Sequence, residues 1–234
     1  MTVLVVIPTF NEASTITRTL RKVFELHPEV SVLVVDDNSP DGTAKLVRQL
    51  GDEQRNLFVL ERPRKQGLGV AYLAGFRWGF EKGFDQIVEM DADGSHRAED
   101  LSKLLNAVHH ADLVIGSRWI LGGQVINWSA LRKLVSKVGN RYAKSVLRTE
   151  IYDMTSGFRI YQAEFLKQLL SENVSSHGYS FQVELAYRAS RQGKVLEVPI
   201  TFVERSSGES KMTLAIVFEA LTKVTFWGLK RLLR

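Results

Sequence analysis

The sequence predicts an α/β protein built on a single, mostly parallel sheet with helices on both faces. Short runs of almost wholly apolar residues alternate with amphipathic stretches of helical length through the first half of the chain. Strands that read as continuous apolar runs are buried on both faces, which is the usual state of parallel strands joined by crossover helices. The chain has 234 residues, of which 44% are apolar and 24% are charged, and this composition suits one sizeable globular domain.

Strands and helices follow one another in the first half of the chain. Residues 3–7 form a short β-branched run closed by Pro8, and residues 12–24 carry apolar side chains at helical spacing. The other predicted strands are 32–35, 57–60, 86–90 and 113–115. Two further helices are predicted: one follows the loop 36–43 and ends at residue 50, and the other covers residues 71–80. Because ligands bind at the carboxyl ends of the strands in such sheets, the segments after these strands should face one crevice, namely residues 8–12, 36–41, 91–93 and 116–118.

The second half of the chain is less regular. Residues 153–160 predict a loop that leads into a strand, and residues 195–202 predict a further strand. The segment 206–210 is small and polar, lies between Arg205 and Lys211, and could close over a ligand. Helices are predicted over residues 128–147, 164–170 and 182–191.

The C-terminal segment 211–234 predicts a basic amphipathic helix. It carries five cations and one carboxylate, so most of the net charge of +5 lies here. Its apolar stripe is interrupted by charged residues and never reaches the length of a membrane span. With Phe226 and Trp227, such a helix suits an anionic membrane surface or a groove on a membrane partner. The same stripe also suits a helix packed on its own core.

Composition bounds the compartment and the partners. The chain has no cysteine, which excludes disulfides and thiolate chemistry and agrees with a reducing cytoplasm. The first residues lack a basic leader, and the apolar run 3–7 is too short for a signal peptide. The basic residues are not interleaved with aromatic residues as in nucleic-acid-binding proteins. We therefore expect a cytoplasmic protein, peripheral on the cytoplasmic face of a membrane, that binds no nucleic acid.

Two carboxylates stand at the end of the fourth predicted strand. Asp91 and Asp93 are separated by Ala92, so in an extended chain they lie about 6.6 Å apart on the same face. Two such charges about 5 Å apart repel by roughly 3 kcal/mol at an effective dielectric of about 20, and a hard cation such as Mg²⁺ or Mn²⁺ would remove this cost. Spacing alone fits equally well a turn that ends the strand and caps the next helix.

The crevice also has basic residues within reach. Asp37 joins the two aspartates, and Arg118, Arg205 and Lys211 can neutralise phosphate charge, which favours a nucleotide-diphosphate site with a bridging metal. The sequence has no Walker motif and no dinucleotide-binding glycine spacing, so neither an ATPase nor an NAD enzyme is supported. The glycines at 67 and 69 fit an ordinary turn better than a phosphate cradle.

Six motifs together carry a family resemblance. They are Ile7-Pro8-Thr9-Phe10-Asn11-Glu12, Val35-Asp36-Asp37-Asn38-Ser39-Pro40-Asp41-Gly42-Thr43, Met90-Asp91-Ala92-Asp93, Gly116-Ser117-Arg118, Thr155-Ser156-Gly157-Phe158-Arg159 and Gly208-Glu209-Ser210-Lys211. This ordered set resembles family 2 glycosyltransferases of the dolichyl/polyprenyl phosphate mannose synthase type, from residue 3 to about residue 212. The resemblance implies a GT-A fold with a Rossmann-like sheet, GDP-mannose as the donor, a dolichyl or polyprenyl phosphate as the acceptor, and Mg²⁺ or Mn²⁺.

The resemblance also implies a domain division and roles for single residues. Residues 1–210 would form the catalytic domain, and 211–234 a helix that docks on a membrane surface or on an integral membrane subunit. Asp91 and Asp93 would bind the metal, and Arg132 and Ser136, four apart on one predicted helix face, resemble acceptor-phosphate positions, although a solvated helix face gives the same spacing. Nucleotide-sugar contacts would come from Pro8, Phe10, Glu12, Val35, Asp37, Asp91, Ala92, Asp93, Arg118, Arg205 and Lys211, and the catalytic residues would be Asp93, Arg118, Arg205 and Lys211.

Two positions depart from the family pattern. Phe10 stands where many relatives have Tyr, which keeps a stacking face but loses a hydroxyl. Gly94 stands where relatives often carry a larger residue, including a Gln that binds the metal, so an ion here would rely more on water. His96 follows the family pattern and fits a structural role better than that of a base.

The implied chemistry needs no general base. A lipid phosphate is already an anion, so the enzyme must position it and disperse charge on the departing GDP. Attack opposite the diphosphate would invert an α-linked donor to a β-mannosyl phosphate. If the acceptor were instead a hydroxyl, Asp153 would be the base. Two other functions fit the sequence: a polyprenyl-phosphate glucose synthase that uses a UDP-sugar, and a nucleotide-sugar-binding subunit that is active only with a membrane partner.

Overall fold

The computed structural model describes residues 1–172, 179–204 and 214–232 of the chain. The strands are β1 (Val3–Thr9), β2 (Ser31–Asp36), β3 (Leu57–Glu61), β4 (Gln86–Glu89), β5 (Leu113–Ser117), β6 (Gln124–Ile126), β7 (Arg159–Gln162), β8 (Val195–Pro199) and β9 (Thr201–Val203). The helices are α1 (Ile16–Leu26), α2 (Thr43–Gly51), α3 (Leu68–Glu81), α4 (Ala98–Ala107), the short 3₁₀ helix η1 (Val108–His110), α5 (Ala130–Leu147), α6 (Ala163–Leu169), α7 (Tyr179–Gln192) and α8 (Leu214–Leu232).

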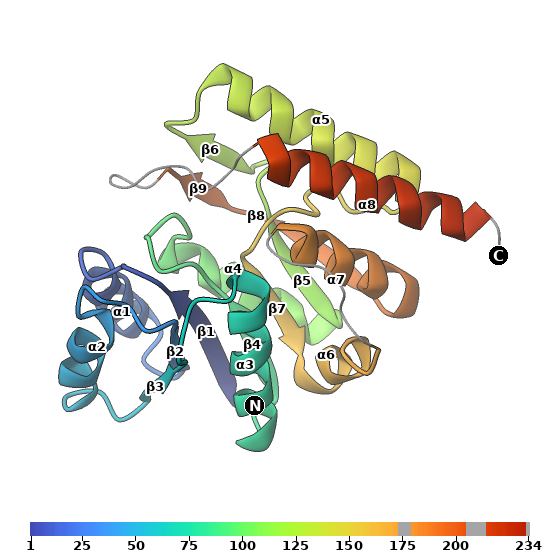
Figure 1. The fold of residues 1–234 in the computed structure, drawn as a ribbon. Helices are drawn as coiled ribbons and strands as arrows, with labels where there is room; N and C mark the ends of the chain where they lie inside the picture. Colours follow the sequence, from blue (N-terminus) through green and yellow to red (C-terminus); the bar gives the residue numbers. More distant parts are fainter. Residues whose placement is uncertain (173–178, 205–213, 233–234) are drawn as a thin grey trace.

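A seven-stranded sheet runs through the molecule in the order β3-β2-β1-β4-β7-β5-β8 (Figure 1). Its strands pair in parallel except where β7 is involved. Alternate side chains of each strand enter two cores, so that Val5 and Ile7 pack with α1, α2 and α4, while Leu4 and Val6 pack with α3 and the C-terminal helices. The predicted α/β fold, with a mostly parallel sheet covered on both faces, is therefore confirmed.

Strand β7 lies between β4 and β5 and runs antiparallel to both. Its first residue, Arg159, is paired with Glu89 of β4 and Ile115 of β5, near the carboxyl ends of those strands. The loop 153–158 that precedes β7 therefore reaches the same edge of the sheet as the loops that follow β4 and β5. The sequence predicts this loop and strand, and the structure shows that the strand runs antiparallel to its neighbours.

The predicted strand 195–202 is divided between two sheets. Strand β8 ends at Pro199, and β9 pairs with β6 in a separate two-stranded sheet. The N–H of Ile200 donates to the Ser117 carbonyl at 3.1 Å, and the N–H of Thr201 donates to the buried carboxylate of Asp100 at 2.9 Å. The first bond ends the β5–β8 pairing, and the second holds Thr201 outside the large sheet. Helix α4 and strand β6 occupy intervals that the sequence leaves unassigned.

Helices α5 and α8 lie side by side on the outside of the molecule (Figure 1). They approach closely because position 228 is glycine: a Cβ there would lie 2.4 Å from Cγ1 of Val146. The hydroxyls of Tyr142 and Thr225 hydrogen-bond across the helix pair at 2.6 Å. Among the residues that the structure describes, no helix combines the length and the apolar character that crossing a membrane requires.

Helix α3 packs on the sheet with almost no space at Gly75. A Cβ added there would lie 2.4 Å from Cγ1 of Val6 and 3.2 Å from Cγ2 of Val35. We expect Gly75→Ala to lower the free energy of unfolding by about 1–3 kcal/mol, because the core must shift to admit one carbon atom. Gly139→Ala in α5 is the matched control, since nothing lies within 4 Å of its added Cβ. Denaturant unfolding that finds both variants equally stable would contradict this packing.

Candidate functional site

Two loops at the carboxyl ends of β1 and β2 are joined by hydrogen bonds. The buried carboxylate of Asp36 accepts from the Thr9 hydroxyl at 2.8 Å and from the N–H and hydroxyl of Ser39 at 2.8 and 2.6 Å. The Ser39 hydroxyl in turn accepts from the N–H of Asn11 at 3.0 Å, and Thr43 accepts from the N–H of Glu12 at 3.1 Å. The predicted segments 8–12 and 36–41 are therefore joined into one hydrogen-bonded wall.

Asp37, a predicted nucleoside contact, is paired with a buried arginine. The Nη1 atom of Arg62 donates to Oδ1 of Asp37 at 2.7 Å, and its Nη2 donates to Oε1 of Gln66 at 2.6 Å. Burial raises the pKa of Asp37 above its ordinary value, although the Arg62 charge opposes the rise. Arg62 was not predicted from the sequence, although it is a cation directly after a strand of the same parallel sheet.

Phe10 lies beside the same pair of loops and is half-buried. The Lys65 ammonium sits 4.3 Å from the centre of its ring. Lys65 belongs to the loop 62–66 that also closes on Asp37. The predicted nucleoside contacts Phe10 and Asp37 are thus covered by one basic loop.

The loop after β4 holds the two predicted metal ligands. The N–H of Asp91 donates to Nδ1 of His96 at 3.0 Å, and the N–H of Ser95 donates to Oδ1 of Asp93 at 3.0 Å. Thr19 of α1 donates to the Ala92 carbonyl at 2.9 Å. The loop therefore has a defined shape built by its own residues and by α1.

His96 is buried and takes part in this shape as a hydrogen-bond acceptor. Its ring stacks on Phe158 with a centroid distance of 5.0 Å and meets Phe202 edge-on at 5.5 Å. Burial lowers the pKa of His96 to about 4, so the ring is neutral near pH 7. This geometry gives His96 a structural role.

The loop 153–158 closes against the Asp91 loop. A Cβ added at Gly157 would lie 3.6 Å from Cε1 of His96 and 3.9 Å from both Oδ1 of Asp91 and Nε2 of Gln182. Gln182 of α7 donates to the buried carboxylate of Glu89 at 2.5 Å. Residue 157 of the Thr155-Ser156-Gly157 motif therefore lies where two loops and a helix meet beside Asp91.

The two aspartates fit a hard divalent cation that shares its coordination with a ligand. The Asp91 side chain keeps 35% of its surface exposed, and Asp93 is half-buried, so their oxygens reach the crevice. Within the described residues, no group of three or more His, Cys, Asp or Glu side chains forms a complete metal cage. A cation at Asp91 and Asp93 would therefore take its other ligands from water and a bound diphosphate, which is the pattern of Mg²⁺ and Mn²⁺ sites.

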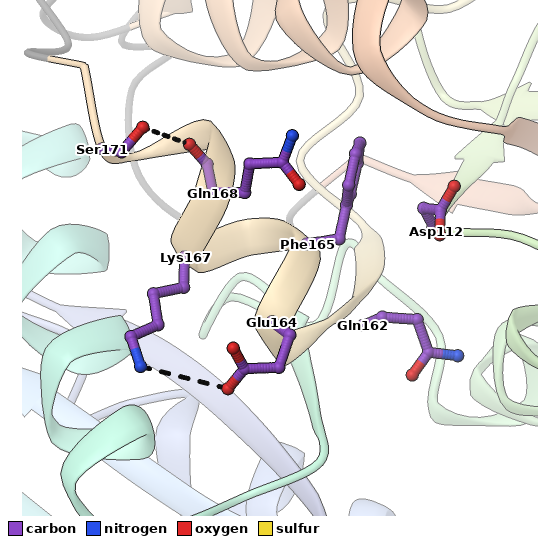
Figure 2. A pocket seen from close by; sticks show the side chains of 7 residues that line it. All are labelled: Asp112, Gln162, Glu164, Phe165, Lys167, Gln168 and Ser171. Atoms are coloured by element: carbon purple, nitrogen blue, oxygen red, sulfur yellow. Dashed lines mark hydrogen bonds and ion pairs between the residues drawn. The ribbon is translucent and has the colours of Figure 1, made fainter.

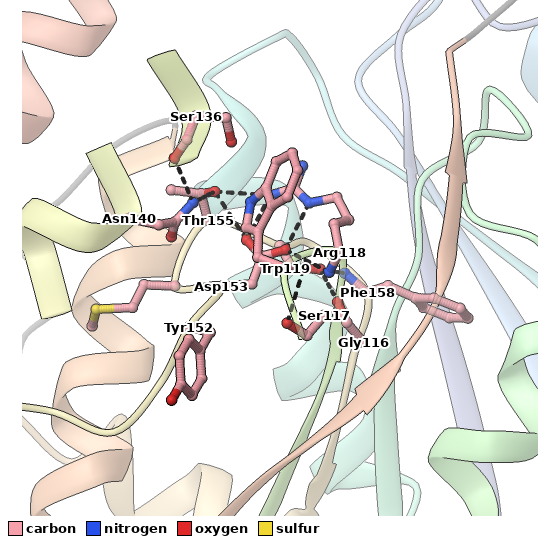
Figure 3. A network of polar contacts seen from close by, with 12 residues as sticks. Gly116, Ser117, Arg118, Trp119, Ser136, Asn140, Tyr152, Asp153, Thr155 and Phe158 are labelled. Carbon is pink, nitrogen blue, oxygen red and sulfur yellow. Dashed lines mark hydrogen bonds and ion pairs between the residues drawn. The ribbon is translucent and has the colours of Figure 1, made fainter. Parts of the chain in front are cut away.

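Arg118, predicted to contact phosphate or mannose, is held by Asp153. Its Nε and Nη2 atoms donate to the two carboxylate oxygens of Asp153, each at 2.7 Å, and the Arg118 N–H donates to Oδ2 at 2.9 Å (Figure 3). Both side chains are buried. Asp153 is therefore a poor candidate for a base, because its two oxygens are engaged and its charge is neutralised.

Arg132 and Ser136 lie in the first half of α5. Arg132 forms an ion pair with Glu204 and lies 4.1 Å from the ring centre of Trp128. Ser136 is half-buried, and its carbonyl accepts from Asn140. The predicted acceptor-phosphate residues are thus on one helix next to the Arg118 region.

The remaining predicted nucleotide-sugar contacts differ in burial, and two of them lie outside the described residues. Pro8 and Glu12 are half-buried in the β1 loop. The side chain of Val35 is fully buried under α3, so it can offer a ligand only its backbone. Arg205, Lys211 and the segment 206–210 lie outside the described residues.

A surface pocket around α6 lies away from these motifs (Figure 2). It lies where β5 begins and β7 ends, at the end of the sheet opposite to the predicted site residues. Its lining residues are Asp112, Gln162, Glu164, Phe165, Lys167, Gln168 and Ser171.

Comparison with known proteins agrees with this arrangement. Residues 4–170 match the sequence profile of Glycosyl transferase family 2. The chain is 50% identical over 230 residues to an undecaprenyl-phosphate mannosyltransferase of Micrococcus luteus, covering 98% of this chain and 95% of that protein. It is 48% identical over 231 residues to a polyprenol monophosphomannose synthase of Mycolicibacterium smegmatis, covering 97% and 87%.

Solved structures share the fold at low sequence identity. The mannosyltransferase PcManGT of Pyrobaculum calidifontis, in complex with GDP-Man and Mn²⁺, superposes with a TM-score of 0.66 at 19% identity, covering 98% of this chain and 64% of that one. The glucosyl-3-phosphoglycerate synthase of Mycobacterium tuberculosis, in complex with Mn²⁺ and UDP-glucose, gives 0.69 at 20% identity, covering 98% and 78%. The GT-A fold implied by the motifs is confirmed, and the chain is a glycosyltransferase that belongs to Glycosyl transferase family 2.

Proposed function

We propose that this glycosyltransferase transfers mannose from GDP-mannose to a polyprenyl phosphate. The observation that carries the proposal is the pair Asp91 and Asp93, which follow β4 at the same end of the sheet as the β1 and β2 loops. The two relatives near 50% identity are named for mannose and a polyprenyl phosphate, which supports the same donor sugar and acceptor class here. Residues 1–210 form the catalytic domain in this proposal.

The donor nucleotide is proposed from the wall formed by the β1 and β2 loops. Phe10 offers a ring for stacking, and Asp37, which is paired with Arg62, would accept from an N–H group of the base. Guanine is proposed as that base on family resemblance. Pro8, Glu12 and the backbone of Val35 complete the nucleoside contacts in this proposal.

The diphosphate is proposed to lie over Asp91, Ala92 and Asp93. A divalent cation held by the two aspartates would neutralise negative charge on the departing diphosphate. Arg118, which Asp153 and Thr155 hold in a fixed orientation, would face the phosphate or the mannose. Arg205 and Lys211, proposed on family resemblance, would contribute the remaining cations.

The transfer itself is proposed to proceed without a general base. An oxygen of the acceptor phosphate forms a bond to C1 of mannose, and the bond from C1 to the diphosphate oxygen breaks, with the electron pair leaving on GDP. No proton has to move, because the acceptor enters as an anion and the phosphodiester product remains one. Attack opposite the leaving group gives a β-mannosyl phosphate. Arg132 and Ser136 would bind the acceptor phosphate, with Arg132 exchanging Glu204 for it.

The membrane surface is the proposed source of the acceptor. Helix α5 has no acidic residue, and its cations are Arg132, Lys133, Lys137, Arg141 and Lys144. Its first half also exposes an apolar stripe of Leu131, Leu134, Val135 and Val138. The sequence alone predicts membrane contact for residues 211–234. Because α8 exposes Phe226 and Leu229 and lies beside α5, the proposed surface comprises both helices.

Turnover by the isolated chain tests the proposed reaction. Purified protein with Mg²⁺ or Mn²⁺, a short polyprenyl phosphate and labelled GDP-mannose should form lipid-linked mannose without a second subunit. The same assay with labelled UDP-glucose should give no product. Transfer of glucose would overturn the donor, and a need for a membrane subunit would overturn the autonomy of the chain.

Removing one proposed metal ligand should stop the reaction while the fold remains. We expect Asp93→Ala to lower kcat at least about a hundredfold, because the departing diphosphate loses its counter-charge. Its unfolding midpoint should change little, since the structure gives Asp93 one hydrogen bond, to Ser95 N–H, worth about 1 kcal/mol. Glu53→Ala, an exposed carboxylate after α2, is the control and should keep full activity. Normal turnover in Asp93→Ala would refute the metal assignment.

Charge reversal on α5 tests the proposed membrane surface. Lys133→Glu combined with Lys137→Glu should weaken binding to phosphatidylglycerol vesicles at least about tenfold, since each cation near an anionic bilayer contributes about 1 kcal/mol. Arg21→Glu combined with Lys45→Glu on α1 and α2 makes the same change in net charge away from α5. Vesicle sedimentation that finds the two double variants equally impaired would show that binding follows net charge and not this surface.

A further inference from the structure

A buried polar chain joins helix α5 to the loop that holds Arg118 (Figure 3). The Nδ2 atom of Asn140 donates to the Ser136 carbonyl at 3.0 Å and to Oγ1 of Thr155 at 3.1 Å. Thr155 Oγ1 also accepts from Nη2 of Arg118 at 2.8 Å and lies 3.2 Å from Oδ1 of Asp153, to which it donates. One carboxamide thus connects the middle of α5 to the Arg118–Asp153 ion pair.

Asn140 is the point where α5 enters the core. The buried residues of the helix are Asn140, Ala143 and Leu147, all in its second half. The first half carries Arg132 and Ser136 and is otherwise exposed or half-buried. The orientation of that half relative to the crevice therefore depends on what Asn140 contacts.

Stability alone does not explain an asparagine at this position. Its side chain is buried, 2% exposed, yet in the described part of the chain its Oδ1 atom has no hydrogen-bond partner. A buried polar atom without a partner costs about 1–3 kcal/mol, and Asn is a poorer helix former than Leu. Leucine has a similar shape and would extend the apolar face of Ala143 and Leu147. The amide is thus retained at a cost to the fold.

We propose that Asn140 is a positioning residue that sets the distance between the acceptor site and the donor site. Through Thr155 it fixes the helix that carries Arg132 and Ser136 relative to Arg118. This inference rests on the proposed function, because it assigns the acceptor phosphate to α5 and the donor to the Arg118 side. Reaction rates depend steeply on this separation, and a misplacement of about 1 Å can cost about a hundredfold in rate.

Asn140→Leu separates positioning from stability, because activity toward the acceptor should fall while the stability of the fold stays equal or rises. Its unfolding midpoint should equal or exceed that of the parent protein, since the unpartnered oxygen is removed. Its kcat/KM for polyprenyl phosphate should fall at least about tenfold, while KM for GDP-mannose stays within about twofold. A merely structural residue would not give a more stable but less active enzyme with an intact donor site.

Thr155 provides the second arm of the test. Thr155→Val keeps the shape and removes the hydroxyl, so its kcat/KM for polyprenyl phosphate should fall as in Asn140→Leu. Thr155→Ser keeps the hydroxyl and should restore most of the activity. Ser145→Ala, on the exposed side of the same helix, is the control and should behave as the parent protein.

Two outcomes would overturn the inference. One is an unchanged kcat/KM for polyprenyl phosphate in Asn140→Leu. The other is a lower unfolding midpoint in this variant together with a higher KM for both GDP-mannose and polyprenyl phosphate. If the parent protein transfers no mannose, the proposed function fails, and amide hydrogen exchange over residues 131–139 decides the inference separately. Faster exchange there in Asn140→Leu and Thr155→Val, but not in Thr155→Ser, supports it, and unchanged exchange in all three refutes it.

Discussion

The loops at the carboxyl end of the sheet depend on the hydrogen bonds made by the guanidinium of Arg159. This side chain is completely buried, and it donates to the carbonyl oxygens of Ser156 and Met154, both at 2.7 Å, and of Gln182 at 2.8 Å. Its charge lies beside that of Glu89, its register neighbour on β4. A buried cation is tolerated only when nearly all its donors are satisfied, so β7, the loop before it and the start of α7 must be built together.

That requirement gives the loop 153–158 fixed partners close to the site of the proposed chemistry. The loop that Arg159 holds also supplies Asp153 to Arg118, and it brings Gly157 against the Asp91 loop. Among the described residues at this end of the sheet, Asp153, the alternative base, is bound to Arg118, and Asp37 is bound to Arg62. Such a site is suited to an acceptor that is already charged and needs positions and counter-charges rather than proton transfer.

The sequence predicts those parts of the fold and site that depend on local pattern. Asp91 and Asp93 could be placed in the crevice because they follow an apolar strand of a parallel sheet. The Arg118–Asp153 pair could not be predicted, because its members are far apart in sequence and the direction of β7 that joins them has no local signal. The role of Asn140 could not be predicted for a related reason: on an amphipathic helix it is one more polar position, and its burial depends on how α5 packs. The run 195–202 is mostly apolar, so its division between two sheets depends on the hydrogen bond from Thr201 to Asp100.

In the proposed site, Asp91 and Asp93 hold a divalent cation against the diphosphate of the donor nucleotide. Crystals grown with GDP and Mn²⁺, measured at the manganese absorption edge, test this assignment. We expect one anomalous peak within ligand distance, about 2–2.3 Å, of an oxygen from each aspartate and of the GDP diphosphate. GDP bound with no ion at these carboxylates, or an ion held elsewhere on the chain, would contradict it.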